Sequence, residues 1–299
     1  MEFFNKMIVQ FVKFLPKSLL FLFAKKYIAG TTLQEAINEV GKLNAKGICA
    51  TMDVLGEAIS DLSEADEAKR EVIEMLDIIE QNKLDANVSI KPTQMGLAID
   101  VDYCYKLFDE ILAKAKQLNN FIRIDMEDSP FTDATFNLLI RLREKYDNVG
   151  IVVQAYLKRT MGDITKLNPT GVTYRLCKGI YVEPAEIAYK GYQEVRDNYL
   201  RLLEKIFDDG NYVGIATHDD YLVEGAYKLI EKKKISKDRY EFQMLYGVKE
   251  SLRDKIKNGG HKIRIYVPFG VNWHAYSIRR LQENPKLAWY ITKSIFTFK

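Results

Sequence analysis

Eight short apolar runs rich in β-branched residues are spread along this chain of 299 residues. Longer stretches with apolar residues at helical spacing separate most of these runs. Strands that alternate with helices in this way predict an α/β fold of the closed (β/α)8 type, a TIM-like barrel, and one such barrel accommodates a chain of this length. The predicted strands are Gly47–Val54, Val88–Ile90, Phe121–Ile124, Gly150–Ala155, Val172–Leu176, Val213–Thr217, Tyr240–Leu245 and Ile263–Val267.

A charged or hydrogen-bonding residue stands at or just after the C-terminal end of nearly every run. The C-terminal strand ends of a (β/α)8 barrel open on one mouth, where the active site lies. We therefore expect these residues to converge in space. They are Asp53, Glu57, Lys91, Asp125, Glu127, Gln154, Arg175, Lys178, Thr217, His218, Gln243, Tyr246 and Tyr266.

Apolar residues at helical spacing predict the helices that cover the barrel. Asp102, Thr132 and Asp219 stand where N-cap residues are expected, and Pro184 stands where a first-turn proline is expected. The predicted helices are Glu64–Gln81, Asp102–Gln117, Asp133–Lys145, Lys158–Leu167, Pro184–Phe207, Asp219–Lys232 and Val248–Lys257.

Composition argues against several classes of protein. The 44 basic and 41 acidic residues are intermixed and leave a net charge of only +3, whereas a dedicated nucleic-acid binder usually shows a basic stripe. The three cysteines, Cys49, Cys104 and Cys177, are far apart and form no CxxC pair, which predicts a reducing, cytoplasmic location. The three histidines show no metal-binding spacing, so we expect no metal site.

Residues 1–40 are predicted to form an N-terminal helical arm, and residues 41–299 the catalytic barrel. Lysines interleave with the apolar residues of the first thirty positions, and Pro16 interrupts any continuous helix. No run of about 18 apolar residues exists, which argues against a spanning helix, and the interruptions argue against a signal peptide. Two compatible interpretations remain: short helices packed on the barrel, or a basic amphipathic surface that touches the inner face of the cytoplasmic membrane.

The last predicted helix carries a second group of polar residues. Tyr276, Arg279, Arg280 and Glu283 are spaced at i, i+3, i+4 and i+7, so they share one broad helix face. Guanidinium groups bind carboxylates and phosphates in a bidentate fork, so two adjacent arginines near a barrel mouth predict an anionic substrate. The alternative is an ordinary surface ion pair between Arg279 and Glu283.

Several motifs resemble, in order along the chain, those of the proline dehydrogenase family. The stretch from Tyr276 to Asn284 resembles the family's YxxRRxxEN signature, and the stretch from Arg175 to Tyr181 resembles its R-L-x-K-G-A-Y pattern. The resemblance runs from about residue 15 to about residue 290, and the length resembles that of the monofunctional bacterial enzyme. The other matching segments are Asp53–Glu57, Ser89–Lys91, Ile124–Glu127, Val153–Tyr156, Ala216–His218 and Glu241–Gly247.

The resemblance implies a flavin-dependent barrel that oxidises L-proline to Δ1-pyrroline-5-carboxylate. It implies hydride transfer to the flavin N5 atom, and a membrane quinone that receives the electrons. It also implies FAD as the cofactor, lying across the barrel mouth. The chain has no GxGxxG motif, so no Rossmann site supports FAD.

For the substrate, the resemblance implies that Arg279, Arg280 and Lys91 bind the proline carboxylate, with Asp125 holding Lys91 in position. Glu57 is implied as a gate that pairs with one of the two arginines. The residues implied to form the wall around the five-membered ring are Leu245, Tyr266 and Tyr276.

For the cofactor, the resemblance implies that Arg175 donates to flavin N5 and that Gln154 reaches the polar edge of the isoalloxazine. Lys91, Asp125 and Arg175 are thus the residues implied in catalysis. The residues implied to line the remainder of the cofactor are Cys177, Lys178, Gly179, Tyr181, Thr217, His218 and Glu283.

Three alternatives remain open at this stage. Ile180 replaces the small residue of the family pattern, and Val182 stands where some members carry Trp, so hydroxyproline or another cyclic imino acid is an alternative substrate. A lysine at a strand end also suits a Schiff-base lyase, with Lys91 as the nucleophile. The third alternative is a non-enzymatic membrane-surface binder led by the N-terminal arm.

Overall fold

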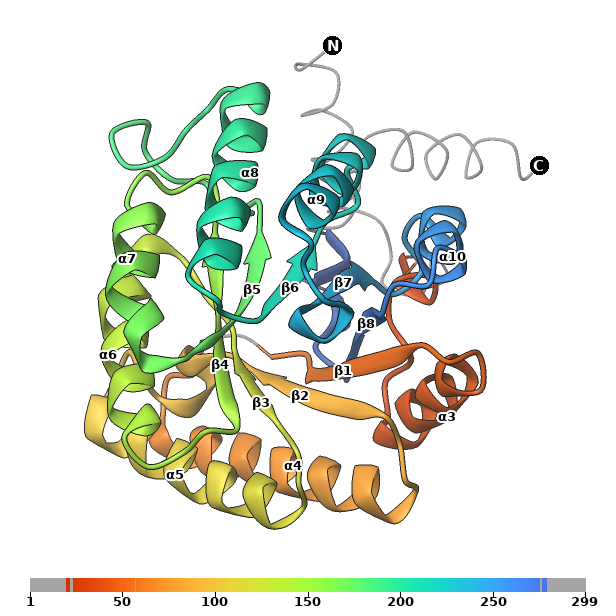
Figure 1. Ribbon diagram of the computed structural model, residues 1–299. Helices are drawn as coiled ribbons and strands as arrows, with labels where there is room; N and C mark the ends of the chain where they lie inside the picture. The colour runs from red at the N-terminus through yellow and green to blue at the C-terminus, as the bar shows by residue number, and fades with distance from the viewer. Residues whose placement is uncertain (1–19, 22–23, 57, 275, 279–299) are drawn as a thin grey trace, which may run out of the picture.

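A computed structural model of the protein describes residues 20–21, 24–56, 58–274 and 276–278, and it shows a closed barrel of eight parallel strands in chain order. Figure 1 looks into this barrel, with the strands inside a ring of helices. Each strand overlaps one of the predicted runs, so the predicted (β/α)8 fold is confirmed. The strands are β1 (Cys49–Val54), β2 (Ala86–Ile90), β3 (Ile122–Ile124), β4 (Val149–Gln154), β5 (Thr173–Cys177), β6 (Val213–Ala216), β7 (Tyr240–Leu245) and β8 (Ile263–Phe269).

The α-helices connect successive strands and pack on the outside of the barrel. They bury the outward faces of the strands, whose residues include Val88, Ile124, Ile151, Val213 and Ile263. The helices are α3 (Leu33–Asn44), α4 (Leu62–Gln81), α5 (Val101–Gln117), α6 (Thr132–Arg143), α7 (Thr160–Leu167), α8 (Tyr192–Asp208), α9 (Asp220–Lys233) and α10 (Glu250–Asn258).

The start of α8 differs from the prediction. The helix begins at Tyr192, so Pro184 lies in the preceding loop and not in a first helical turn. Two interactions hold this loop away from a helical path. The carboxylate of Glu183 accepts hydrogen bonds from the backbone N and the hydroxyl of Ser129, at 2.7 and 2.6 Å. Ala188 forms a β-bridge with Leu157.

Two of the three predicted N-caps are also wrong by a residue or two. Asp100, not Asp102, caps α5, because its carboxylate accepts from the backbone N of Asp102 and Tyr103. Thr132 is the first residue of α6 and not its cap. Asp219 does cap α9, accepting from the backbone N of Tyr221 at 3.2 Å.

The N-terminal part of the described chain packs on the barrel. Leu20, Ala24 and Ile28 are almost fully buried, and α3 lies against β1 and β8. The predicted division of the chain at residue 40 falls inside α3, and the two-unit organisation stays a prediction, since residues 1–19 lie outside the described part. Among the described helices, none combines the length and apolar character needed to cross a bilayer.

The barrel interior is polar. Arg175 of β5 contacts Gln243 of β7, and Arg264 of β8 contacts Glu241 of β7. Interiors of such barrels are more often filled by layers of branched apolar residues. Arg123 of β3 donates across the interior to the carbonyl of Thr173 at 2.6 Å, beside Gly150, where a Cβ would lie 2.4 Å from its Nη1. Glycine on the strand therefore makes room for a long side chain.

We expect Gly150→Ala to lower the free energy of unfolding by about 1–3 kcal/mol, because overpacking forces neighbours out of position. The new Cβ would also lie 2.6 Å from the backbone oxygen of Thr173, which cannot easily move. Gly41→Ala inside α3 is the matched control, since a Cβ there meets no atom within 4 Å. It should raise stability by about 0.5–1 kcal/mol. Urea unfolding followed by circular dichroism measures both variants, and equal stabilities would contradict the packing argument.

Candidate active site

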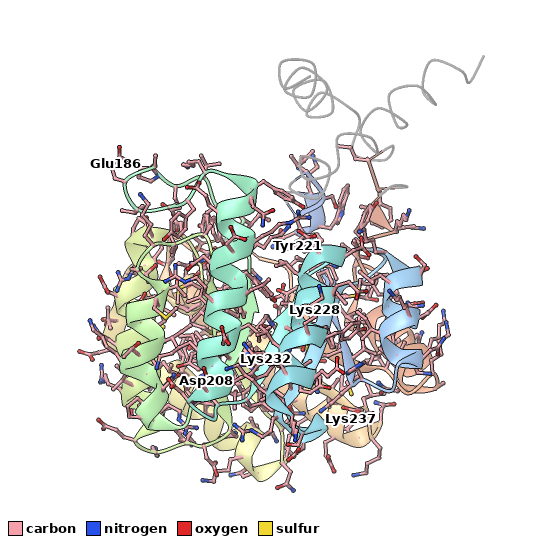
Figure 2. All side chains as sticks on the ribbon, turned by 45° about the horizontal axis from the view of Figure 1, so that its top comes forward. Glu186, Asp208, Tyr221, Lys228, Lys232 and Lys237 are labelled. Atoms are coloured by element: carbon pink, nitrogen blue, oxygen red, sulfur yellow. The ribbon has the colours of Figure 1, made fainter. Side chains whose placement is uncertain are left out.

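The polar strand-end residues gather at one end of the barrel, as predicted. Figure 2 shows this end at the top, where Glu186 of the loop after β5 and Tyr221 at the start of α9 lie. Asp208, Lys232 and Lys237 lie toward the opposite end. Five different strands or strand ends contribute side chains to two bonded groups at this mouth. Lys91 bonds Asp53, and Arg175 and Tyr266 bond Asp125.

Lys91 is held by Asp53 and not by Asp125. Its Nζ lies 2.8 and 2.9 Å from the two carboxylate oxygens of Asp53, which follows from the pairing of β1 with β2. This corrects the expectation that Asp125 positions the lysine. Burial would lower the pKa of Lys91, but the nearby carboxylates of Asp53 and Asp125 outweigh it and raise that pKa. Lys91 is therefore an ammonium ion. Two of its N–H groups lie on Asp53, and no acceptor among the described residues takes the third.

Asp125 instead forms an ion pair with Arg175. Its Oδ1 lies 2.8 Å from Arg175 Nη1 and accepts a hydrogen bond from the Ser89 hydroxyl at 2.6 Å. Its Oδ2 accepts from the Tyr266 hydroxyl at 3.1 Å. The guanidinium lies 5.2 Å from the centre of the Tyr266 ring, and burial raises the pKa of that tyrosine well above its usual value. One carboxylate thus fixes both a cation and an aromatic ring.

The guanidinium of Arg175 still offers donors at the mouth. Its Nε donates to Gln243 at 2.6 Å, and its Nη1 donates to Ser89 and Asp125. Among the described residues, no acceptor takes a hydrogen bond from Nη2, although Arg175 is only 7% exposed. This donor group is available to a ligand atom that accepts hydrogen bonds.

Asp125 and Glu127 do not form a carboxylate pair for acid–base work. Glu127 accepts from the backbone N and the hydroxyl of Thr93, at 2.9 and 2.6 Å, and so anchors the turn after β2. The Gln154 amide nitrogen donates to the backbone oxygen of Glu127 at 2.8 Å. This bond fixes the Gln154 amide, and within the described part of the chain no donor bonds its side-chain oxygen.

The residues predicted to line a cofactor follow β5 and β6. Burial raises the pKa of the Cys177 thiol to about 12, so this residue is a wall and not a nucleophile. Gly179 has φ of +106°, and a Cβ there would lie 2.0 Å from the Tyr156 ring. Lys178 contacts Asp219 at 3.3 Å, so part of its charge is already compensated.

At the end of β6, Thr217 and His218 are held by neighbouring strand ends. The Thr217 backbone N donates to the backbone oxygen of Gln243 at 3.2 Å, and its hydroxyl accepts from the Asp219 backbone N. His218 accepts through Nε2 from the backbone N of Leu245 at 2.8 Å. The contact places a predicted cofactor residue against a predicted substrate-wall residue.

The remaining predicted residues divide into two groups. Tyr276 is buried in a small apolar cluster with Ala24, Tyr27, Ile28 and Leu55, and Tyr181 lies in the loop after β5, next to the exposed Ile180 and Val182. The other predicted residues lie outside the described part of the chain, and their roles stay predictions. These are Glu57, Arg279, Arg280 and Glu283.

A cavity of about 520 Å³ lies beside the mouth, between the end of β1, α4 and the segment after β8. Ser89 lines it, and the same hydroxyl donates to Asp125. Ser89 thus connects the Asp125–Arg175 pair to the wall of this cavity. The acidic residues along the α4 side of this cavity are Glu64, Glu67 and Glu71.

Three residues at the centre of this arrangement had no specific role assigned from the sequence. Asp53 holds Lys91, Ser89 bridges Asp125 and Arg175, and Gln243 holds Arg175. Period-two spacing was an available signal. Ser89 lies two residues before Lys91, and Gln243 lies two residues before Leu245, so each faces the same side of its strand as a predicted site residue.

We expect Asp53→Asn to lower the free energy of unfolding by about 3 kcal/mol, because it leaves the buried ammonium of Lys91 without its carboxylate. Adding Lys91→Met should recover most of this loss, since the uncompensated charge is then gone. Urea unfolding of the wild type, both single variants and the double variant measures the coupling. Additive effects of the two substitutions would show that the pair is not coupled.

The model of the proline dehydrogenase family matches residues 36–289. Proline dehydrogenase 2 of Bacillus subtilis (strain 168) is 36% identical over 262 residues, covering 88% of this chain and 86% of the relative. A proline dehydrogenase of Deinococcus radiodurans is 34% identical over 277 residues, covering 91% and 89%.

Solved structures of larger proteins share the fold. Proline utilization A (PutA) from Bdellovibrio bacteriovorus, inactivated by N-propargylglycine, superposes with a TM-score of 0.83 at 24% identity. The match covers 88% of this chain and 32% of that one. PutA from Bradyrhizobium japonicum superposes with a TM-score of 0.75 at 18% identity, covering 87% and 30%. This chain thus spans about a third of each PutA chain, and the likeness concerns the barrel.

Proposed function

The chain belongs to the proline dehydrogenase family, and from this membership and the geometry of the mouth we propose that it oxidises L-proline to Δ1-pyrroline-5-carboxylate with bound FAD. The observation that carries the proposal is that one mouth holds two bonded groups, Lys91 on Asp53, and Arg175 with Tyr266 on Asp125. These residues combine a donor for a carboxylate, a wall for a small ring and a donor pair for a flavin.

The substrate carboxylate is bound by Lys91. The remaining N–H of its ammonium group makes a charge-assisted hydrogen bond, which is among the stronger hydrogen bonds in proteins. The carboxylate of Asp53 holds the Lys91 ammonium group in place. Arg279 and Arg280, which the sequence puts on one face of the last helix, complete the clamp.

The ring of proline packs on Tyr266, with Leu245 beside it. The hydrogen bond from Tyr266 to Asp125 fixes the orientation of the aromatic ring, so the apolar CH₂ groups of the substrate meet a flat surface that does not rotate. Holding a reactant in one orientation removes part of the entropic barrier to reaction. Tyr276 and Glu57 are further proposed contacts of the substrate.

Arg175 faces the cofactor. Bound FAD would supply N5 as the hydride acceptor for proline oxidation, and a membrane quinone would receive the electrons. The free N–H groups of Arg175 stabilise the electron-rich reduced ring, since positive charge near developing negative charge lowers its free energy. Gln154, Cys177, Lys178, Gly179, Tyr181, Thr217, His218 and Glu283 line the remainder of the cofactor in this proposal.

The lyase alternative is disfavoured by the ion pair of Lys91. A Schiff-base nucleophile must lose its proton, whereas the carboxylates around Lys91 raise the pKa of this lysine.

Hydroxyproline stays an alternative substrate. Ile180 and Val182, the two departures from the family pattern, are 41% and 100% exposed on the loop after β5.

We propose that the N-terminal arm, residues 1–40, touches the cytoplasmic face of the membrane as a peripheral contact.

Anaerobic titration of the purified yellow protein with L-proline tests the function. We expect the flavin absorbance to bleach at stoichiometric amounts of reducing substrate, and trans-4-hydroxyproline in a parallel titration tests the alternative substrate. A colourless protein that borohydride links covalently to its substrate would support the lyase instead. Oxidised flavin that stays yellow in both titrations would contradict oxidation of either imino acid.

Lys91 and Arg175 should affect different kinetic constants. Replacing Lys91 by Met, in the Asp53→Asn background that keeps the site free of an unpaired charge, should raise KM for proline by about 30-fold or more, since losing a charged hydrogen-bond partner costs about 2–5 kcal/mol. Arg175→Met should mainly lower the rate constant of flavin reduction. Stopped-flow reduction at varied proline concentrations separates the two effects. A flavin lost from the Lys91 variant would contradict a carboxylate role.

The reduction rate should rise with pH. The substrate nitrogen must be unprotonated when hydride leaves, because its lone pair becomes the C=N π bond. Deprotonation of bound proline therefore increases the reactive fraction as pH rises through the pKa of its amine. Stopped-flow reduction at saturating proline across alkaline pH measures this, and a rate that falls with pH would contradict it.

A further inference from the structure

A line of hydrogen-bonded side chains runs from Arg175 into the interior of the barrel. Arg175 Nε donates to Gln243 Oε1 at 2.6 Å, and Gln243 Nε2 donates to Glu241 Oε1 at 2.7 Å. Arg264 Nε donates to the same Glu241 oxygen at 2.7 Å, and its Nη1 donates to the backbone oxygen of Ala50. All of these side chains are at most 7% exposed. Bulk water therefore does not replace a lost contact easily.

Glu241 decides which way the Gln243 amide points. An ionised carboxylate only accepts hydrogen bonds, so it must face the NH₂ group of the amide. The amide oxygen then faces Arg175, whose Nε–H needs an acceptor. Burial would raise the pKa of Glu241, but the charges of Arg264 and Lys262 outweigh it and lower that pKa to about 2, so the carboxylate stays ionised.

The neighbouring strand leaves room for this arrangement. A Cβ on Gly214 of β6 would lie 2.3 Å from Gln243 Nε2 and 2.7 Å from its Cδ. The amide therefore occupies the space that a side chain at position 214 would fill. It is confined to one position between β6 and the barrel axis.

Two anchors define the plane of the Arg175 guanidinium. Asp125 and Ser89 hold Nη1, and Gln243 holds Nε on the adjacent edge. If only Nη1 were held, the planar guanidinium could rotate about the contacts of that atom. With both edges held, the two N–H groups of Nη2 have one direction.

We propose that Glu241, acting through Gln243, is a positioning residue that fixes the Arg175 guanidinium toward the bound cofactor. This inference rests on the proposed function, since it names how one of its residues is held. Neither Glu241 nor Gln243 contacts the substrate in the proposed site. Their effect is to keep a donor of the site in the one orientation that serves the reduced ring.

Replacing Gln243 by Leu tests the anchor. The rate constant of flavin reduction by proline should fall about 10- to 100-fold, because misplacing a group by about 1 Å costs up to a hundredfold, whereas the proline concentration at half-saturation should change little. The midpoint potential of the flavin, measured with a chemical reductant, should become more negative. This potential reports the placement of Arg175 without proline, so it separates a failure of the inference from a failure of the proposed function.

Thr51→Val is the matched control. Thr51 is 1% exposed and donates to Asn87 inside the same barrel, so the variant also loses a buried hydrogen bond. It should lose stability without a change in reduction rate or in flavin potential. A Gln243→Leu variant that loses only stability, like this control, would overturn the inference.

A swap of the two side chains gives a rescue experiment. Gln243→Glu alone places two carboxylates face to face and should reduce flavin slowly. The double variant Glu241→Gln, Gln243→Glu restores an amide donor beside a carboxylate acceptor and presents the acceptor to Arg175. Recovery of about tenfold or more in reduction rate supports the proposal. A double variant no faster than Gln243→Glu alone would overturn it.

Discussion

The buried ion pair between Asp125 and Arg175 is the interaction on which the rest of the mouth depends. Removing two charges from water is costly, and the attraction between them repays that cost only when further hydrogen bonds complete the pair. Here Ser89, Tyr266 and Gln243 supply those bonds. The same contacts that make the pair tolerable therefore also fix the ring and the guanidinium that the proposed chemistry uses. The hydrogen bonds that stabilise the ion pair are thus the same ones that set the geometry of the site.

This constraint extends through the barrel. An arginine pointing inward needs acceptors, and the strands provide them with carbonyls, amides and carboxylates in place of the apolar layers found in many barrels. Arg123 shows the cost: burial and the nearby charge of Arg175 lower its pKa, and its Nη1 is satisfied by the carbonyls of Ile151 and Thr173. The apolar outer faces of the strands supply the stabilisation that offsets such groups. Interior and exterior of the same strands thus serve different purposes, alternating residue by residue.

The pattern of apolar runs was sufficient to predict the eight strands and the meeting of their polar ends, because period and burial are local properties of the sequence. The partner of Lys91 was not predictable in this way. Asp53 and Asp125 are both acidic and both stand at strand ends, and only the closed barrel decides which one Lys91 reaches. The late start of α8 has a similar cause, since the contact of Glu183 with Ser129 joins segments more than fifty residues apart. Such long-range pairings overrule a local helical pattern.

The charges at the mouth also indicate where affinity for an anion must come from. Lys91 and Arg175 are each paired with a carboxylate, Asp53 and Asp125, so these four side chains contribute no net charge. Each cation can still donate a hydrogen bond, but neither pair attracts a carboxylate over a distance. The uncompensated positive charge for an anionic substrate must then be supplied by other groups, and the adjacent arginines predicted at the last helix have the required sign and geometry. In the proposed function, the described residues orient the substrate and the predicted arginines attract it.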